Sequence, residues 1–202
     1  MNELKRRSRS IAVGPALALG RLGFTPNALT IGGSLLTASV GLLAAQGWFA
    51  WAGVCLWLFS LTDTLDGALA RATDRVTPFG AFLDSVCDRY AEAGVFFGLV
   101  WWYHGAGNSL GVGLAYVAII GSLMVSYARA RAEGIGLQAA EVGLLQRPER
   151  IVVLGLGLFA AQFIPEALLL ALAILAVFTT TTVIQRVLHI ARALRASGLE
   201  RQ

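Results

Sequence analysis

Four aspartates lie close together between residues 63 and 88 of a chain that is otherwise mostly apolar. Asp63 and Asp66 are three residues apart, and Asp84 and Asp88 are four apart. On helices, residues at these spacings share one face. Four carboxylates within a few ångströms of one another repel strongly unless cations lie among them. Because hard oxygen ligands favour Mg²⁺, Mn²⁺ or Ca²⁺ over Zn²⁺, this stretch predicts a metal–carboxylate centre.

Small and basic residues accompany the aspartates. Gly67 leaves room for a ligand against a helix backbone, although glycines also serve close helix packing. Arg71 suits a phosphate group, and Gly80 begins the segment that carries the second pair of aspartates. The alternative interpretation is a set of helix-end carboxylates that pair with nearby arginines. Four aspartates on two facing helices, with glycines beside them, favour a functional site.

The composition indicates the surroundings of these residues. The chain has 202 residues, of which 56% are hydrophobic and 14% are charged, whereas soluble domains are about 25% charged. A chain of this size cannot bury so much apolar surface in one soluble core, so a lipid bilayer is its natural solvent. We therefore expect an all-α integral membrane protein, with no nucleic-acid partner.

The apolar runs predict a single membrane domain over residues 1–202 with six transmembrane helices. Runs near 20 residues match a bilayer core of about 30 Å. The basic segment 1–24 is weakly amphipathic and is expected to form a short N-terminal interfacial helix. The six spans are expected at residues 28–45, 48–70, 80–103, 110–131, 149–163 and 167–188.

Lysines and arginines support an even number of spans. All 16 fall in the N-terminal segment, the connection after the second span with its adjoining helix ends, the connection after the fourth span, or the C-terminal region. The three opposite connections contain none. By the positive-inside rule, the basic side and both termini are cytoplasmic. The four aspartates then lie at the cytoplasmic ends of the second and third spans, facing the cytoplasm from the inner membrane.

The aspartate stretch has the spacing D-x-x-D-G-x-x-A-R, eight residues, then G-x-x-x-D-x-x-x-D. The chain reads DTLDGALAR over residues 63–71 and GAFLDSVCD over residues 80–88, so every fixed position matches. In this it resembles the CDP-alcohol phosphotransferase family of phospholipid biosynthesis. The six expected spans with cytoplasmic termini fit that family as well, so the resemblance extends to the whole chain.

The resemblance implies a metal-dependent reaction with roles for named residues. A CDP-linked lipid, CDP-diacylglycerol or an ether analogue, would donate its phosphatidyl-type group to the hydroxyl of an acceptor alcohol and release CMP. The cofactor would be a divalent metal, Mg²⁺ or Mn²⁺, with two ions, and the enzyme would be a homodimer. Carried over by position, the metal ligands are Asp63, Asp66, Asp84 and Asp88, Asp88 is also the general base, and the CDP-binding residues are Asp66, Gly67, Arg71 and Gly80.

A second region bears on the acceptor. The runs SYARARAE over residues 126–133 and RPER over residues 147–150 resemble the corresponding segment of phosphatidylinositol-phosphate synthases, which use inositol 1-phosphate. That subfamily often has lysine where Arg129 stands. An arginine cluster suits a phosphorylated alcohol, whereas the alternative is that the arginines only anchor the cytoplasmic side. The expected acceptor-phosphate site consists of Ser126, Arg129, Arg147, Arg150 and Arg186.

Two other functions fit parts of the sequence. The same reaction with glycerol 3-phosphate or another alcohol as acceptor would need the same aspartates. A divalent-cation transporter would also place carboxylates inside a membrane domain. A transporter needs access from both faces, however, and every acidic residue except Glu166 lies toward the cytoplasmic side. The sequence therefore favours a phosphotransferase whose partners are a CDP-lipid, a phosphorylated alcohol and the bilayer.

Overall fold

The computed structural model describes residues 13–137 and 142–197, and these form helices and connections without a strand. A helical segment over residues 13–21 precedes the longer helices. The longer helices are α2 (Pro26–Ala45), α3 (Phe49–Ser60), α4 (Thr62–Ala72), α5 (Pro78–Gly105), α6 (Ser109–Gly134), α7 (Arg147–Ala161) and α8 (Glu166–Ser197). The predicted all-α class is confirmed for the described part of the chain.

Local sequence fixes where the two helices nearest the aspartates begin. The Thr25 hydroxyl accepts a hydrogen bond from the Ala28 amide at 3.2 Å, and α2 follows. The Thr77 hydroxyl accepts one from the Gly80 amide at 3.0 Å, and α5 follows. In both helices a proline comes next, where its missing amide hydrogen is not needed. Both helices therefore begin two residues before the spans expected from residues 28 and 80.

Small residues let the helices pack closely. A Cβ atom added to Gly41 of α2 would collide with the Gly94 carbonyl oxygen of α5, and one on Gly98 would collide with Gly41. On the other side of the molecule, Gly53 of α3 lies against the backbone of α7 at Gly155. Close backbone approach through small residues is the usual way in which membrane helices associate.

The stretch predicted as the second span, residues 48–70, forms two helices in the structure. The chain forms α3 and α4 with a break at Leu61, and neither proline nor glycine is at the break. Hydroxyl groups explain it: Ser60 donates to the Leu56 carbonyl at 2.7 Å, and Thr62 donates to the Phe59 carbonyl at 2.5 Å. Such bonds compete with the helix ladder and bend helices. The aspartates of the first pair therefore lie on a short helix of their own.

Three helices in the described ranges are long and apolar enough to cross a membrane: Pro26–Ala45, Ser109–Gly134 and Glu166–Ala196. α3 has 12 residues and α7 has 15, which is short for a span. α5 has 28 residues, but its first half carries charged side chains. The described helices thus include three candidate membrane spans, as expected of an integral membrane protein.

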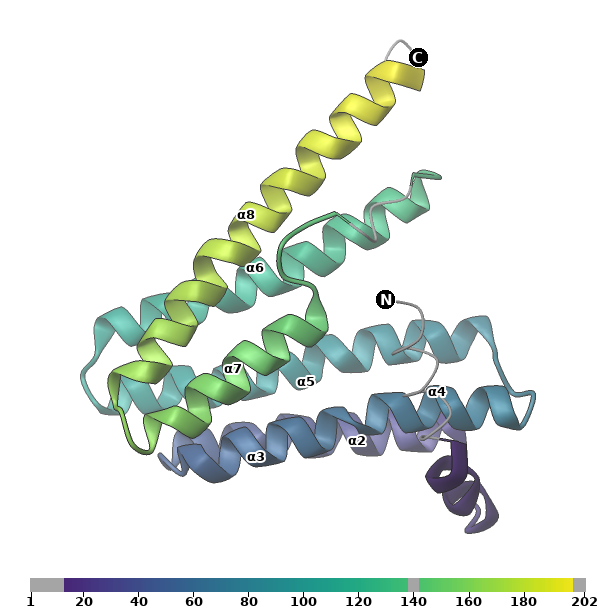
Figure 1. Cartoon of the computed structure of the whole chain (residues 1–202), viewed down its shortest axis with the longest axis horizontal. Coiled ribbons are helices and arrows are strands. Elements are labelled where there is room, and N and C mark those ends of the chain that lie inside the picture. Colours follow the sequence, from purple (N-terminus) through teal and green to yellow (C-terminus); the bar gives the residue numbers. More distant parts are fainter. Residues whose placement is uncertain (1–12, 138–141, 198–202) are drawn as a thin grey trace.

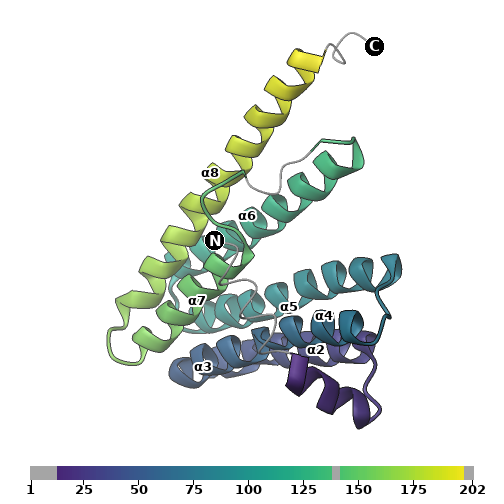
Figure 2. The ribbon, with the colours of Figure 1, turned by 45° about the vertical axis from the view of Figure 1, so that its right-hand side comes forward.

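Figure 1 shows the connections gathered at two ends of the molecule. The turns at residues 46–48, 106–108 and 162–165, which carry no lysine or arginine, lie at one end. The loop 73–77 and the C-terminal end of α6 lie at the other. Toward this second end, α6 and α8 diverge from α4 and α5, as Figures 1 and 2 both show. The aspartates lie on α4 and α5 near the loop 73–77.

Candidate active site

The two aspartate pairs come from neighbouring helices joined by one short loop. Asp63 is in the first turn of α4, and Asp66 follows one turn later. Asp84 and Asp88 lie in the first half of α5. Because α4 approaches the loop 73–77 and α5 leaves it, the four carboxylates lie on facing segments at the same end of the molecule. The shared metal site expected of these carboxylates stays a prediction.

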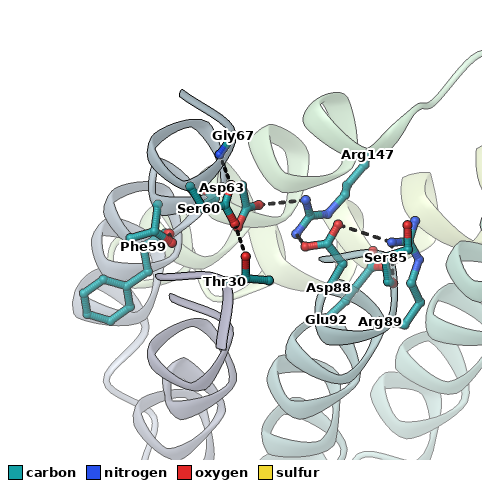
Figure 3. Close-up of polar contacts among 12 residues, drawn as sticks. Thr30, Phe59, Ser60, Asp63, Gly67, Ser85, Asp88, Arg89, Glu92 and Arg147 are labelled. Atoms are coloured by element: carbon teal, nitrogen blue, oxygen red, sulfur yellow. Dashed lines mark hydrogen bonds and ion pairs between the residues drawn. The ribbon is translucent and has the colours of Figure 1, made fainter. Parts of the chain in front are cut away.

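Arg147, at the first position of α7, joins the two pairs. Its Nη1 atom is 2.7 Å from Asp63 Oδ2, and its Nη2 atom is 2.7 Å from Asp88 Oδ1. Figure 3 shows the guanidinium reaching between the two carboxylates. The Asp88 residue is only 5% exposed, so the charge of Arg147 compensates a carboxylate that water hardly reaches. Sequence analysis predicted Arg147 to bind the acceptor phosphate, whereas here it contacts two predicted metal ligands.

Asp66 is held by two donors. The Thr30 hydroxyl of α2 donates to Asp66 Oδ2 at 2.6 Å, and the Gly67 amide donates to Oδ1. Asp66 is 6% exposed, and Thr30 is also buried. Thr30 was missed by the sequence analysis. The only signal for it was a hydroxyl in the first turns of the span, which also contains Ser34, Thr37 and Ser39, so by itself it also fits helix packing.

A cavity of about 250 Å³ opens beside Asp66, at the junction of α2, α4 and α5. It is bounded by all four predicted CDP-binding residues and by one further aspartate: Asp66, Gly67, Arg71, Gly80 and Asp84. Residues that the sequence analysis did not assign complete the wall: Pro26, Asn27, Thr30, Ala70, Arg75, Val76, Thr77 and Ala81. The structure therefore brings the predicted nucleotide-binding residues to one cavity.

Gly67 contributes to this cavity by having no side chain. A Cβ atom there would lie 3.1 Å from Arg71 Nη1, tighter than ordinary contact. The glycine thus lets the Arg71 guanidinium lie back over the helix turn, along the cavity wall. At Gly80, a Cβ atom would lie 3.1 Å from the Thr77 hydroxyl and 3.4 Å from Asn27 Oδ1. Both glycines of the motif keep polar groups close to the cavity.

Arg89, next to Asp88, connects the aspartates to α6. Its Nη1 atom lies 3.2 Å from Asp88 Oδ2 and donates to the Ser85 carbonyl at 2.8 Å, as Figure 3 shows. Its Nη2 atom donates to the Ser126 hydroxyl at 3.0 Å. Ser126 was predicted to bind the acceptor phosphate. In the structure it contacts Arg89, which in turn contacts Asp88, the predicted base. Arg89 itself was not predicted as a site residue.

The remaining arginines of the predicted acceptor site already have partners. Arg150 is 3% exposed and pairs with Glu92, with 3.2 Å between Nε and Oε1. Arg186 is equally buried, and its Nε donates to the Val142 carbonyl at 2.8 Å. Arg129 is on the surface. Its Nε lies 2.9 Å from Glu133 Oε1, and both side chains are about half exposed. Their role toward an acceptor stays a prediction.

The donor set suits a hard divalent cation. All four candidate ligands are carboxylates, and the Arg147 guanidinium within 2.7 Å of two of them indicates that a positive charge is accommodated between α4 and α5. In the arrangement described, Arg147 contacts one oxygen each of Asp63 and Asp88, and Thr30 contacts one oxygen of Asp66. Within residues 13–137 and 142–197, no three histidine, cysteine, aspartate or glutamate side chains are close enough together to hold a metal ion in this arrangement.

Comparisons with known proteins agree with this geometry. The family model for CDP-alcohol phosphatidyltransferases matches residues 24–194. The chain therefore belongs to the CDP-alcohol phosphatidyltransferase family. The resemblance stated from the aspartate motif is confirmed, and family membership favours a phosphotransferase over the cation transporter.

The relatives include a narrower group. A phosphatidylinositol phosphate synthase of Mycobacteroides abscessus is 45% identical over 175 residues, which cover 85% of this chain and 79% of that protein.

Two crystal structures of the Mycobacterium tuberculosis phosphatidylinositol phosphate synthase have the same fold. The one with CDP-DAG bound gives a TM-score of 0.83 at 35% identity and covers 90% of this chain and 94% of that one. The one in complex with manganese and citrate gives 0.83 at 34% identity, with coverage of 89% and 88%.

Proposed function

We propose that this protein is a phosphatidylinositol-phosphate synthase: it transfers the phosphatidyl-type group of a CDP-linked lipid to a hydroxyl of inositol 1-phosphate and releases CMP. The observation that carries the proposal is the 250 Å³ cavity lined by Asp66, Gly67, Arg71 and Gly80, next to the other aspartates. The relatives that share the fold are synthases of this kind, and one was solved with CDP-DAG bound.

The cavity suits the cytidine diphosphate part of the donor. Arg71 supplies a guanidinium for a phosphate group, and Asn27 and Thr77 supply further polar atoms along the wall. The backbone at Gly67 is free of a side chain, which allows close approach of a ligand. CDP bound here would have its diphosphate beside Asp66 and Asp84. Cations are needed there to offset the repulsion between the diphosphate and the carboxylates.

A second opening suits the lipid part of the donor. A groove of about 370 Å³ lies between the α3–α4 break and α7. Asp63 and Arg147 stand at its polar end, and its walls are mostly apolar: Trp57, Leu61, Pro148, Ile151 and Val152. An acyl or ether chain could remain in the bilayer along this groove while the diphosphate stays at the aspartates.

Asp63, Asp66, Asp84 and Asp88 would hold divalent cations, Mg²⁺ or Mn²⁺. When bound, the metal offsets the charge of the diphosphate and stabilises the departing CMP. Asp88 accepts the proton of the acceptor hydroxyl while that oxygen bonds to the phosphorus that carries the lipid. The bond from this phosphorus to the CMP oxygen then breaks. The manganese in one relative's crystal structure supports the metal assignment.

The acceptor site would lie between the aspartates and the diverging ends of α6 and α8. Arg129 and Arg150 both act electrostatically on Arg186, and Arg147 and Arg150 both act on Arg89. The five arginines thus lie together beside Asp88, with Glu92 and Glu133 also among them. A phosphate monoester is attracted to clustered arginines, and Ser126 offers a hydroxyl close to the base.

The membrane arrangement is part of the proposal. Six crossings would place α3 with α4, and α7, in the bilayer together with the long helices. Both termini and the site would face the cytoplasm from the inner membrane, with residues 1–24 at the interface. The gathering of the uncharged turns at one end supports this orientation. A homodimer is expected from the family resemblance.

One assay tests both the reaction and the acceptor. Purified protein is given CDP-diacylglycerol and Mg²⁺ with inositol 1-phosphate, glycerol 3-phosphate, serine or free inositol, and CMP is measured. We expect CMP with inositol 1-phosphate and none above background with the others. CMP release only with glycerol 3-phosphate would contradict inositol 1-phosphate as the acceptor. No CMP release with any acceptor would contradict the proposed transfer reaction.

A further inference from the structure

Arg147 lies where its guanidinium can bind either of two partners, the aspartate carboxylates or a phosphate group. Its guanidinium bridges Asp63 and Asp88, which come from two helices, at 2.7 Å on each side. Both carboxylates are metal ligands in the proposed function. A divalent cation and this guanidinium therefore compete for the same oxygens. Conversely, a phosphate group near α7 competes with the two carboxylates for the guanidinium.

The backbone beneath Arg147 is fixed. One turn further along α7, Arg150 is 3% exposed and pairs with Glu92 of α5. Just before α7, the Leu144 amide donates to the Thr182 hydroxyl of α8 at 3.1 Å. These contacts tie the start of α7 to α5 and α8. A change of partner by Arg147 is thus a movement of its side chain, without a shift of the helix.

Arg147 lines two openings, of which only the larger has room for a moved guanidinium. Arg147 lines a small internal cavity of about 20 Å³, the volume of about one water molecule. It also lines the groove of about 370 Å³ between α3 and α7. Its side chain is 25% exposed, whereas that of Asp88 is 7% exposed. The guanidinium can therefore turn toward water while the carboxylate cannot.

We propose that Arg147 couples the metal site to the phosphate of the acceptor. In one arrangement the guanidinium bridges Asp63 and Asp88. In the other it binds a phosphate group, and a divalent cation takes its place between the carboxylates. The inference rests on the proposed function for the identity of the metal ligands. Because coupling between sites is reciprocal, a phosphate raises the affinity for the metal as much as the metal raises the affinity for the phosphate.

Metal binding tests this without any turnover. Purified protein, with no CDP-lipid, is titrated with Mn²⁺ with and without inorganic phosphate, and free Mn²⁺ is measured by electron paramagnetic resonance against a protein-free blank. We expect phosphate to tighten Mn²⁺ binding at least about fivefold in the native sequence, the lower end of usual coupling between sites. An affinity that phosphate leaves unchanged would overturn the proposal.

Variants of Arg147 separate coupling from simple ligand binding. Arg147→Gln removes the competitor, so Mn²⁺ should bind at least about fivefold tighter than to the native protein, and phosphate should have no further effect. Arg147→Lys keeps the charge but cannot span two carboxylates, so its Mn²⁺ affinity should lie between that of the native protein and that of Arg147→Gln. Equal or weaker Mn²⁺ binding in both variants would contradict the competition. If Arg147→Gln does not fold, Arg147→Lys carries the test.

A matched control removes the same charge elsewhere. Arg192 is exposed near the C-terminal end of α8, so Arg192→Gln should bind Mn²⁺ as the native protein does and keep its response to phosphate. A loss of the response in this control would assign the effect to net charge and overturn the role of Arg147. Since no donor or CMP enters these measurements, a failed transferase assay and a failed coupling test remain distinguishable.

Discussion

The aspartates and the arginines of the site are brought together in different ways. The four aspartates lie on two consecutive helices joined by the loop 73–77, and their spacing along each helix already places them on one face. The arginines come from α5, α6, α7 and α8, and each depends on how distant helices pack. The difference teaches that one short stretch can define the reaction, whereas the acceptor site is a property of the whole fold.

The two regions also differ in how their charges are satisfied. The aspartates have too few cations for four carboxylates, and one arginine, Arg147, reaches two of them. The predicted acceptor arginines are already paired, either with a carboxylate, as in Arg150, or with backbone carbonyls, as in Arg186. A site short of positive charge suits a metal. A site whose arginines are already paired suits a ligand that contacts only a few of those arginines.

Of the changes considered, metal removal should reduce CMP release the most. It acts on the aspartate region alone. Exhaustive chelation with EDTA should abolish CMP release from CDP-diacylglycerol, since the diphosphate then meets four carboxylates without a compensating cation. Readdition of Mg²⁺ or Mn²⁺ should restore the activity. The native protein treated with metal-saturated EDTA is the control. Turnover that survives chelation would remove the metal from the mechanism.

Loss of the predicted base comes next. Asp88→Asn keeps the shape of the side chain but accepts no proton, so CMP release should fall about 10²- to 10⁴-fold. The matched control is Asp74→Asn, because Asp74 is exposed in the loop 73–77 and asparagine tolerates its positive φ of 53°. The control should keep native activity and native chromatographic behaviour in detergent. Substantial turnover by Asp88→Asn would exclude Asp88 as the base.

Sequence reasoning succeeded where contacts are local. Helices α2 and α5 each begin at a proline that follows a threonine, two residues before the expected starts at residues 28 and 80, and the placement of the aspartate pairs on neighbouring helices follows from helix spacing and a short loop. The break at Leu61 was missed because it depends on Ser60 and Thr62 hydroxyls bonding to their own helix backbone. In the sequence those residues look like the polar end of one continuous span.

Contacts between distant helices could not be predicted. Thr30 reaches Asp66 across 36 positions, and Arg89 reaches Ser126 across 37, so both depend on how helices pack. Arg147 was predicted to bind the acceptor phosphate, and its contacts with Asp63 and Asp88 were not foreseen. Opposite charges attract at any sequence separation, and only the packing of α7 against the other helices selects Asp63 and Asp88.

The third effect tests one of these distant contacts. Thr30→Val removes the hydroxyl that donates to Asp66 while keeping the branched shape. A hydrogen bond to a charged group contributes about 1.5–3 kcal/mol, so the KM for CDP-diacylglycerol should rise by roughly 10- to 100-fold. Thr30→Ser should restore most of the affinity. Ser39→Ala, an exposed hydroxyl on the same helix, is the control. An unchanged KM would show that Thr30 only packs.

The smallest effect concerns the exposed end of the arginine region. Arg129 pairs with Glu133 at the surface, and exposed pairs are weak. If Arg129 attracts the acceptor phosphate, Arg129→Gln should raise the KM for inositol 1-phosphate by about two- to fivefold, and Glu133→Gln should lower it by about twofold because it frees the guanidinium. Both should leave the KM for CDP-diacylglycerol unchanged, as the donor contacts the other region. Shifts of the same sign in the two variants would show that Arg129 acts on the fold and not on the acceptor.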